Sequence, residues 1–107
     1  MGNLAFAERL LASFDKRFVA DVAQIEQNLA ARNTAELVRV AHQLKGASAN
    51  MSAPRLQRVA AEIEQHGRAD RLDAIPEQLA LLRQEWDYFN QHRASQNTNQ
   101  SLEEPRR

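Results

Sequence analysis

The 107-residue chain contains no cysteine, and it has only three glycines, three prolines and 6% aromatic residues. Without cysteine it forms neither a disulfide framework nor a thiolate metal site, which fits a reducing cytosol. Its 14 basic and 14 acidic residues cancel, whereas a nucleic-acid or anionic-membrane partner would require clustered positive charge. No apolar run approaches about 18 residues and no signal peptide is recognisable, so we expect a soluble, cytoplasmic protein.

The residues that the chain has in abundance are alanine, leucine, glutamine, glutamate and arginine, which favour helices. In four stretches the apolar residues recur at intervals of three and four, the spacing of one face of an α-helix. These stretches cover residues 4–32, 33–51, 54–67 and 72–89. Because the polar links between them are short, the sequence predicts an all-α fold, an up-down-up-down antiparallel four-helix bundle.

Several residues predict where these helices begin and end. Asn33 is expected to cap the second helix, with Glu36 completing a capping box. Pro54 suits the first position of the third helix and Pro76 the first turn of the last, because a missing N–H costs nothing there. Gly67 is expected to end the third helix.

The two ends of the chain have less definite patterns than its middle. The first stretch contains no strong helix breaker, so it is either one long helix or a short and a long helix joined near residues 14–16. Phe6 and Leu10 continue its apolar stripe towards the N-terminus. We expect residues 1–93 to form the bundle, and residues 94–107, which are too polar to bury anything, to form a disordered tail.

The second stretch has an unusual outer face. Its apolar side consists of Leu37, Val40, Ala41, Leu44, Ser48 and Met51. His42 then points nearly opposite to that side, and Lys45 and Gly46 lie one turn further along. A glycine inside a helix costs about 1 kcal/mol relative to alanine, and such broken local rules cluster at functional sites. This face is therefore the candidate site.

The run from Ala41 to Ala49 reads Ala-His-Gln-Leu-Lys-Gly-Ala-Ser-Ala, and it is followed by Leu56, Ile63 and Glu64. In these residues the chain resembles the histidine-containing phosphotransfer (HPt) domain family, and the likeness extends from about Leu10 to Phe89. The resemblance implies a four-helix bundle with an additional short N-terminal helix, which favours a break or kink in the first helix. The chain departs from the family at Ser52, where a glycine is usual.

The resemblance implies that the chain is a phosphoryl carrier with His42 as the phosphoacceptor. Imidazole suits this role because a fraction of it is neutral and nucleophilic near pH 7. Lys45 can place positive charge beside the phosphoryl oxygens, and Gly46 leaves room for the phosphoryl group and the partner. Carried over from the family, Glu64 accepts a hydrogen bond from Nδ1–H of the imidazole, so that Nε2 attacks.

The chain has no glycine-rich nucleotide loop and no acidic metal cluster, so we expect a carrier that binds no cofactor or metal and is not an enzyme. The resemblance implies that its partners are response-regulator receiver domains, whose aspartate and bound Mg²⁺ complete the transfer site, and also a hybrid sensor kinase. The docking surface around His42 is expected to consist of Val38, Arg39, Gln43, Ala49 and Ala53. One histidine on a self-contained bundle favours a monomer.

Two other interpretations use the same helices. The chain could be a helical adaptor that binds receiver domains without being phosphorylated, or the dimerising bundle of a sensor kinase. The kinase interpretation predicts an acidic residue after the histidine, whereas Gln43 follows His42. His66 is expected to interact with the carbonyl end of its helix, and His92, near a fraying helix end, to behave in the same way. A zinc site is not expected, because the sequence has no pair of histidines four residues apart and no cysteine.

Overall fold

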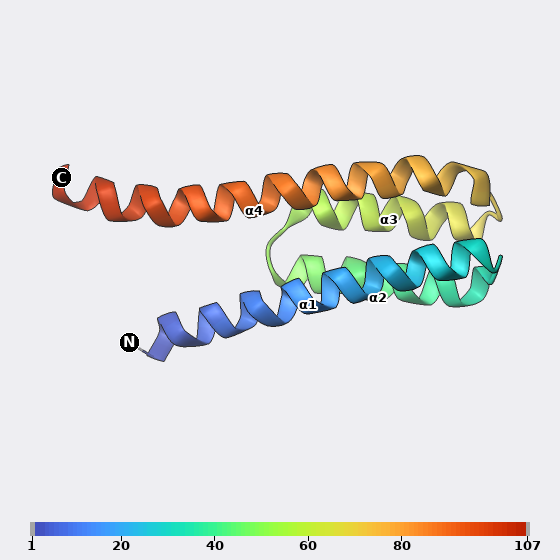
Figure 1. Cartoon of the computed structure of the whole chain (residues 1–107), viewed down its shortest axis with the longest axis horizontal. Helices are drawn as coiled ribbons and strands as arrows, with labels where there is room; N and C mark the ends of the chain where they lie inside the picture. The colour runs from blue at the N-terminus through green and yellow to red at the C-terminus, as the bar shows by residue number, and fades with distance from the viewer. Residues whose placement is uncertain (1, 107) are drawn as a thin grey trace.

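The computed structural model describes the backbone of residues 2–106 and the side chains of residues 5–93. Its elements are α1 (Gly2–Ala30), α2 (Thr34–Asn50), α3 (Pro54–Arg68), a short 3₁₀ turn η1 (Leu72–Ala74) and α4 (Ile75–Arg106). Figure 1 shows α2 and α3 as a short hairpin alongside the long α1 and α4, which both extend beyond it at the end that carries the termini. The backbone between residues 2 and 106 contains no strand, and the predicted four-helix bundle is confirmed.

The core lies along the axis of the bundle and receives side chains from every helix. Its fully buried large residues are Ile25, Leu37, Val40, Leu44, Leu56, Ile63, Ile75 and Leu82. All of them lie within the four stretches in which apolar residues recur at intervals of three and four. Each contributes about 1.5–3 kcal/mol by its burial, so the apolar stripes account for the way the helices associate.

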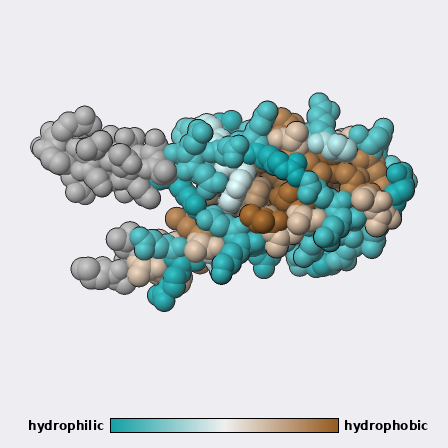
Figure 2. Space-filling view, viewed as in Figure 1, coloured by the Kyte–Doolittle hydropathy of each residue, from teal (hydrophilic) through white to brown (hydrophobic). Residues whose placement is uncertain are grey.

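Aromatic side chains join α1 to α4 at the end of the bundle that carries the termini. The rings of Phe18 and Trp86 are stacked, with centroids 3.9 Å apart, and Phe14 meets both Trp86 and Phe89 edge to face at 5.7 Å. A groove with a volume of about 410 Å³ runs beside this cluster between the two helices. In Figure 2 hydrophobic surface gathers in the middle of this face, surrounded by hydrophilic side chains.

Helix α1 is continuous from Gly2 to Ala30. The helix runs through residues 14–16 without a break, and no separate short helix precedes it within residues 2–30. At this point Phe14 is buried and packs against Trp86 of α4. The apolar stripe continues through Phe6 and Leu10 in the sequence, but these side chains are 59% and 44% exposed and do not join the core. Since α2 and α3 end before this part of α1, they do not cover it (Figure 1).

The predicted cap of α2 is confirmed in part. The side chain of Asn33 accepts a hydrogen bond from the backbone N–H of Glu36 at 3.4 Å. The carboxylate of Glu36 pairs with Arg39 on the exposed surface and does not return to the backbone of Asn33, so the capping box is half formed. The turn after α2 has Ser52 at a φ of 55°, a left-handed conformation that costs a non-glycine residue about 1–2 kcal/mol.

Gly67 does not end α3, contrary to the prediction. The helix continues to Arg68, and the left-handed residue that reverses the chain is Asp70, with a φ of 58°. A Cβ atom on Gly67 would lie 2.7 Å from Cγ2 of Val38 and 3.3 Å from Cδ2 of Leu37. Glycine is needed here because α2 and α3 approach closely at this point, and the close approach sets the distance between the facing residues of these helices.

The backbone of α4 is helical as far as Arg106, whereas the side chains after residue 93 lie outside the described residues. The division into a bundle of residues 1–93 and a disordered tail of residues 94–107 stays a prediction. Within the described part of the chain, no helix combines the length and the apolar character needed to cross a membrane.

Candidate functional site

His42 lies in the middle of α2 and points away from the core. The apolar stripe of the helix is buried, with Val40, Ala41 and Leu44 each fully inaccessible to solvent. The side chain of His42 is 62% exposed. The imidazole is therefore available to a partner that approaches the outer face of the bundle.

Glu64 on α3 connects the residues of the site. It is a buried acid, with 3% of its surface exposed. Its Oε2 lies 3.0 Å from Nδ1 of His42 and 2.6 Å from Nη2 of Arg68, and its Oε1 lies 2.9 Å from Nζ of Lys45. The structure thus brings together the predicted residues His42, Lys45 and Glu64, and adds Arg68.

The carboxylate of Glu64 is held in its charged form. Burial acts to raise the pKa of Glu64, but its contacts with Arg68, Lys45 and His42 outweigh burial and lower that pKa from 4.5 to about 2. A buried carboxylate requires such partners, because an uncompensated buried charge is costly. Glu64 is therefore an anion under physiological conditions.

The geometry determines which nitrogen of His42 carries the proton in the neutral ring. An ionised carboxylate can only accept hydrogen bonds. With Nδ1 of His42 3.0 Å from Glu64 Oε2, the favourable tautomer has its proton on Nδ1. The lone pair then lies on Nε2, which is the nitrogen that can attack an electrophile.

Gly46 differs from Gly67 in the space around it. A Cβ atom on Gly46 would meet no heavy atom within 4 Å, so packing within the described structure does not require glycine there. Gly46 is exposed and one turn along the helix from His42. The space beside the imidazole is therefore open.

The predicted docking residues do not all lie on the surface. Arg39, Gln43 and Ala49 are exposed, and Val38 is half-buried against α3. Ala53 is only 5% exposed and belongs to the core, because the turn between α2 and α3 folds its side chain inward. Its assignment to a docking surface is wrong.

The sequence pattern does not indicate a role for Arg68 in the site. It follows Glu64 by four residues on α3, and an acidic residue followed by a basic one at this spacing forms a favourable helical pair. That signal is present in many helices and does not by itself indicate a functional site. The contact of the same carboxylate with His42 at 3.0 Å distinguishes this pair from the others.

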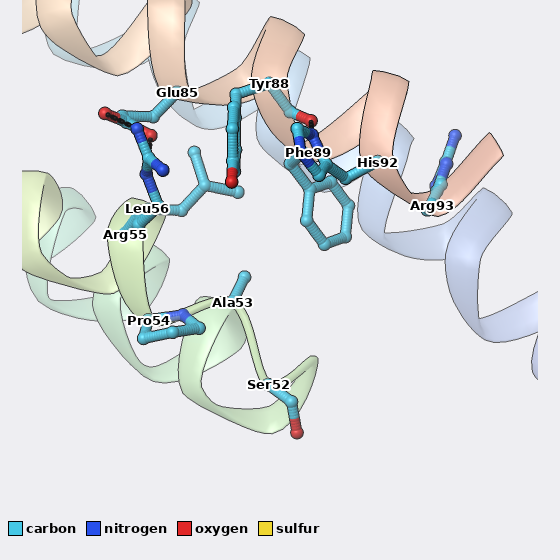
Figure 3. A pocket seen from close by; sticks show the side chains of 10 residues that line it. All are labelled: Ser52, Ala53, Pro54, Arg55, Leu56, Glu85, Tyr88, Phe89, His92 and Arg93. Atoms are coloured by element: carbon cyan, nitrogen blue, oxygen red, sulfur yellow. Dashed lines mark hydrogen bonds and ion pairs between the residues drawn. The ribbon is translucent and has the colours of Figure 1, made fainter. Parts of the chain in front are cut away.

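Three hollows of the surface are lined by residues other than His42. One pocket of about 270 Å³ lies between the turn after α2, the start of α3 and α4 (Figure 3). There Arg55 pairs with Glu85 at 2.6 Å, and its guanidinium lies 3.7 Å from the centre of the Tyr88 ring. These contacts connect α3 to α4. The side chain of His42 is 62% exposed, so the candidate site is an open face rather than a pocket.

Among the described residues, no group of three or more His, Cys, Asp or Glu side chains is placed to hold a metal ion. The expectation that Mg²⁺ is bound by a partner stays a prediction.

A comparison with protein families finds that the family model described as the Hpt domain matches residues 9–92 of the chain. No curated protein and no solved structure matches the chain. The match covers α2, α3 and the cluster around Glu64, and the chain belongs to the Hpt (histidine-containing phosphotransfer) domain family.

Proposed function

We propose that the chain is a phosphorelay intermediate, in which His42 accepts a phosphoryl group from the aspartate of a receiver domain and passes it to the aspartate of another. Hpt domains are phosphoryl carriers of two-component signalling rather than kinases. The observation that supports the role of His42 most directly is its geometry. The ring is 62% exposed, and its Nδ1 lies 3.0 Å from a buried carboxylate.

In the proposed step, Nε2 of His42 attacks the phosphorus of an aspartyl phosphate. The N–P bond forms while the O–P bond to the aspartate breaks, and the aspartate leaves as a carboxylate. The ring keeps its proton on Nδ1, so it becomes positively charged as the bond forms. Glu64, 3.0 Å from Nδ1, stabilises this developing charge more than it stabilises the neutral ring, and therefore lowers the barrier.

Lys45 and Gly46 serve the phosphoryl group in this proposal. Nζ of Lys45 lies 2.9 Å from Glu64 Oε1, and the side chain is 33% exposed. Because its stem is flexible, the ammonium can move from the carboxylate to the equatorial phosphoryl oxygens. Gly46 leaves the adjacent surface free of a side chain. Mg²⁺ on the receiver domain would neutralise the remaining charge.

The receiver domain is proposed to dock on the face that surrounds His42. This face includes Val38, Arg39, Gln43 and Ala49. Its mixture of small apolar and polar groups suits a transient interface. We propose that the chain acts as a monomer in the cytoplasm, with receiver domains, including that of a hybrid sensor kinase, as its partners.

A transfer assay tests this function. A receiver domain phosphorylated by acetyl phosphate in the presence of Mg²⁺ is mixed with the chain, and acid-labile phosphate on the chain is measured. The wild type should become labelled and His42→Gln should not. The exposed His92 provides the control His92→Gln, which should be labelled like the wild type. Binding of the receiver domain without label would indicate an adaptor instead.

A further inference from the structure

Arg68 is the last residue of α3 and contacts the same carboxylate oxygen as His42. Its Nη2 lies 2.6 Å and its Nε 3.2 Å from Oε2 of Glu64. That oxygen also lies 3.0 Å from Nδ1 of His42. The oxygen that the imidazole uses is therefore shared with the guanidinium.

The two cations of the cluster constrain the carboxylate differently. Lys45 reaches Oε1 of Glu64 with a single ammonium on a flexible stem. Arg68 presents two nitrogens of a planar, rigid group to Oε2, which fixes the position of that oxygen more sharply. If Arg68 were removed, Oε2 would retain only the imidazole as a partner.

Arg68 also affects the tautomer of the ring through Glu64. An ionised carboxylate only accepts hydrogen bonds, so Oε2, 3.0 Å from Nδ1 of His42, favours the neutral tautomer with its proton on Nδ1. If Oε2 moves away, the ring loses this preference, and the tautomer with its proton on Nε2 has no lone pair there with which to attack.

We propose that Arg68 is a positioning residue of the transfer site, which holds Glu64 Oε2 at Nδ1 of His42 and so keeps the proton of the neutral ring on Nδ1, with Nε2 free. The proposal rests on the proposed function. The charged groups of the cluster are Lys45 from α2 and Glu64 and Arg68 from α3. Arg39, one turn before His42, is engaged by Glu36.

The test uses the full chain with ¹⁵N-labelled histidine and two readouts. The first, without any partner, is the ¹⁵N chemical shifts of His42 at pH 7, which report the tautomer of the ring. The second is the rate of phosphoryl transfer from a phosphorylated receiver domain. The variants are Arg68→Ala, Arg68→Lys and the control Arg58→Ala. Arg58 is an exposed arginine of the same helix that makes no ion pair within the described side chains.

Arg68→Ala should increase the share of the His42 tautomer that carries its proton on Nε2 and slow transfer about tenfold. Arg68→Lys should restore part of both, and Arg58→Ala should change neither. Arg68 is 57% exposed, so its variants should retain the fold, which the helical circular dichroism signal checks. Unchanged ¹⁵N shifts in Arg68→Ala would overturn the proposal, whether or not transfer is slowed, because slowing alone would indicate a contact with the partner.

The two readouts separate this proposal from the proposed function. If the wild type accepts no phosphate but Arg68→Ala still changes the ¹⁵N shifts of His42, the positioning role stands and the relay function fails. If the wild type transfers phosphate and the shifts of Arg68→Ala match its own, the relay stands and the positioning role fails.

Discussion

Oε2 of Glu64 on α3 lies 3.0 Å from Nδ1 of His42 on α2, although the two residues are 22 positions apart in the sequence. The acid is buried and the base is exposed, so the carboxylate can orient and stabilise the ring without blocking its outer nitrogen. This arrangement depends on the close approach of the two helices. Gly67, three residues after Glu64, permits that approach because it places no side chain against Val38.

The charge of Glu64 should matter more to transfer than its shape. Glu64→Gln keeps an oxygen that can accept from Nδ1–H but removes the negative charge that we propose stabilises the ring in the transition state. We expect transfer to slow by about 10²-fold, in line with the loss of one preorganised electrostatic contact. Rates are measured by single-turnover mixing with a phosphorylated receiver domain. Glu62→Gln is the control, since Glu62 is 56% exposed on the same helix. A rate for Glu64→Gln within twofold of the wild type would contradict the assignment.

The lowered pKa of Glu64 should make the stability of the bundle depend on pH. Its pKa is about 2 in the folded chain instead of 4.5, so the stabilisation is present above pH 4.5 and disappears as the pH falls from about 4.5 to 2. The contribution at neutral pH is at most about 3 kcal/mol. Urea unfolding between pH 2 and 7 measures it. Glu64→Gln should show a flatter profile than the wild type in this window, and identical slopes would refute this account of the cluster.

The charged form of Asp21 should destabilise the bundle, whereas the charged form of Glu64 stabilises it. It is 6% exposed on α1, and its Oδ2 is buried without a hydrogen-bond partner. Burial raises the pKa of Asp21, and Arg17 and Arg39 offset this only in part. The charged form is therefore disfavoured in the folded chain, and the penalty grows as the pH rises through that raised pKa.

Asp21→Asn should consequently stabilise the bundle by about 1 kcal/mol at pH 7, and the gain should vanish below the usual pKa of an aspartate. Thermal unfolding at pH 3 and pH 7 tests this. The exposed Asp87 on α4 supplies the control Asp87→Asn, which should leave stability unchanged. A loss of stability in Asp21→Asn at pH 7 would show that the carboxylate makes a favourable interaction.

Gly67→Ala should destabilise the chain, because its Cβ would lie 2.7 Å from Cγ2 of Val38. Overpacking of this kind costs about 1–3 kcal/mol. Since Val38 supplies the nearest atom, the double variant Val38→Ala with Gly67→Ala should be more stable than the sum of the two single effects predicts. Chemical denaturation of all three variants measures the coupling. Strict additivity would mean that the contact with Val38 is not the reason for the glycine.

Gly46→Ala should stabilise the chain, in contrast to Gly67→Ala, but should slow phosphoryl transfer. A Cβ atom there would contact nothing within 4 Å, so alanine should stabilise α2 by about 1 kcal/mol through its helix propensity. Phosphoryl transfer should slow, because the methyl group occupies the space beside His42 that we propose for the phosphoryl group and the partner. A variant that is both more stable and fully active would show that Gly46 has no part in the site.

The features that follow from local spacing could be predicted from the sequence. The four helices, the inner stripes, the cap at Asn33 and the outward direction of His42 depend on residues within one or two turns of each other. The positions that could not be predicted depend on how the helices are placed. Gly67 was expected to end a helix because glycine is common at helix C-termini. The residue that explains the glycine, Val38, belongs to another helix and is distant in the sequence.

The placement of the helices also explains why other residues differ from their predicted positions. Ala53 was expected on the surface, but the path of the turn buries it. Phe6 continues an apolar stripe whose inner face is left uncovered, because α2 and α3 are shorter than α1. The contact of Arg68 with the carboxylate used by His42 requires α2 and α3 to lie side by side. Pattern alone identifies the face of a helix, not the element that lies against it.

The measurement that tests the relay most directly is ³¹P and ¹⁵N NMR of the chain after reaction with a phosphorylated receiver domain. The account predicts one phosphoramidate, with phosphorus bonded to Nε2 of His42 and hydrogen retained on Nδ1, and no such signal from His42→Gln. Phosphate bonded to Nδ1, or phosphate on another residue of the wild type, would contradict it, because Nδ1 faces Glu64 at 3.0 Å and has no room for a phosphoryl group.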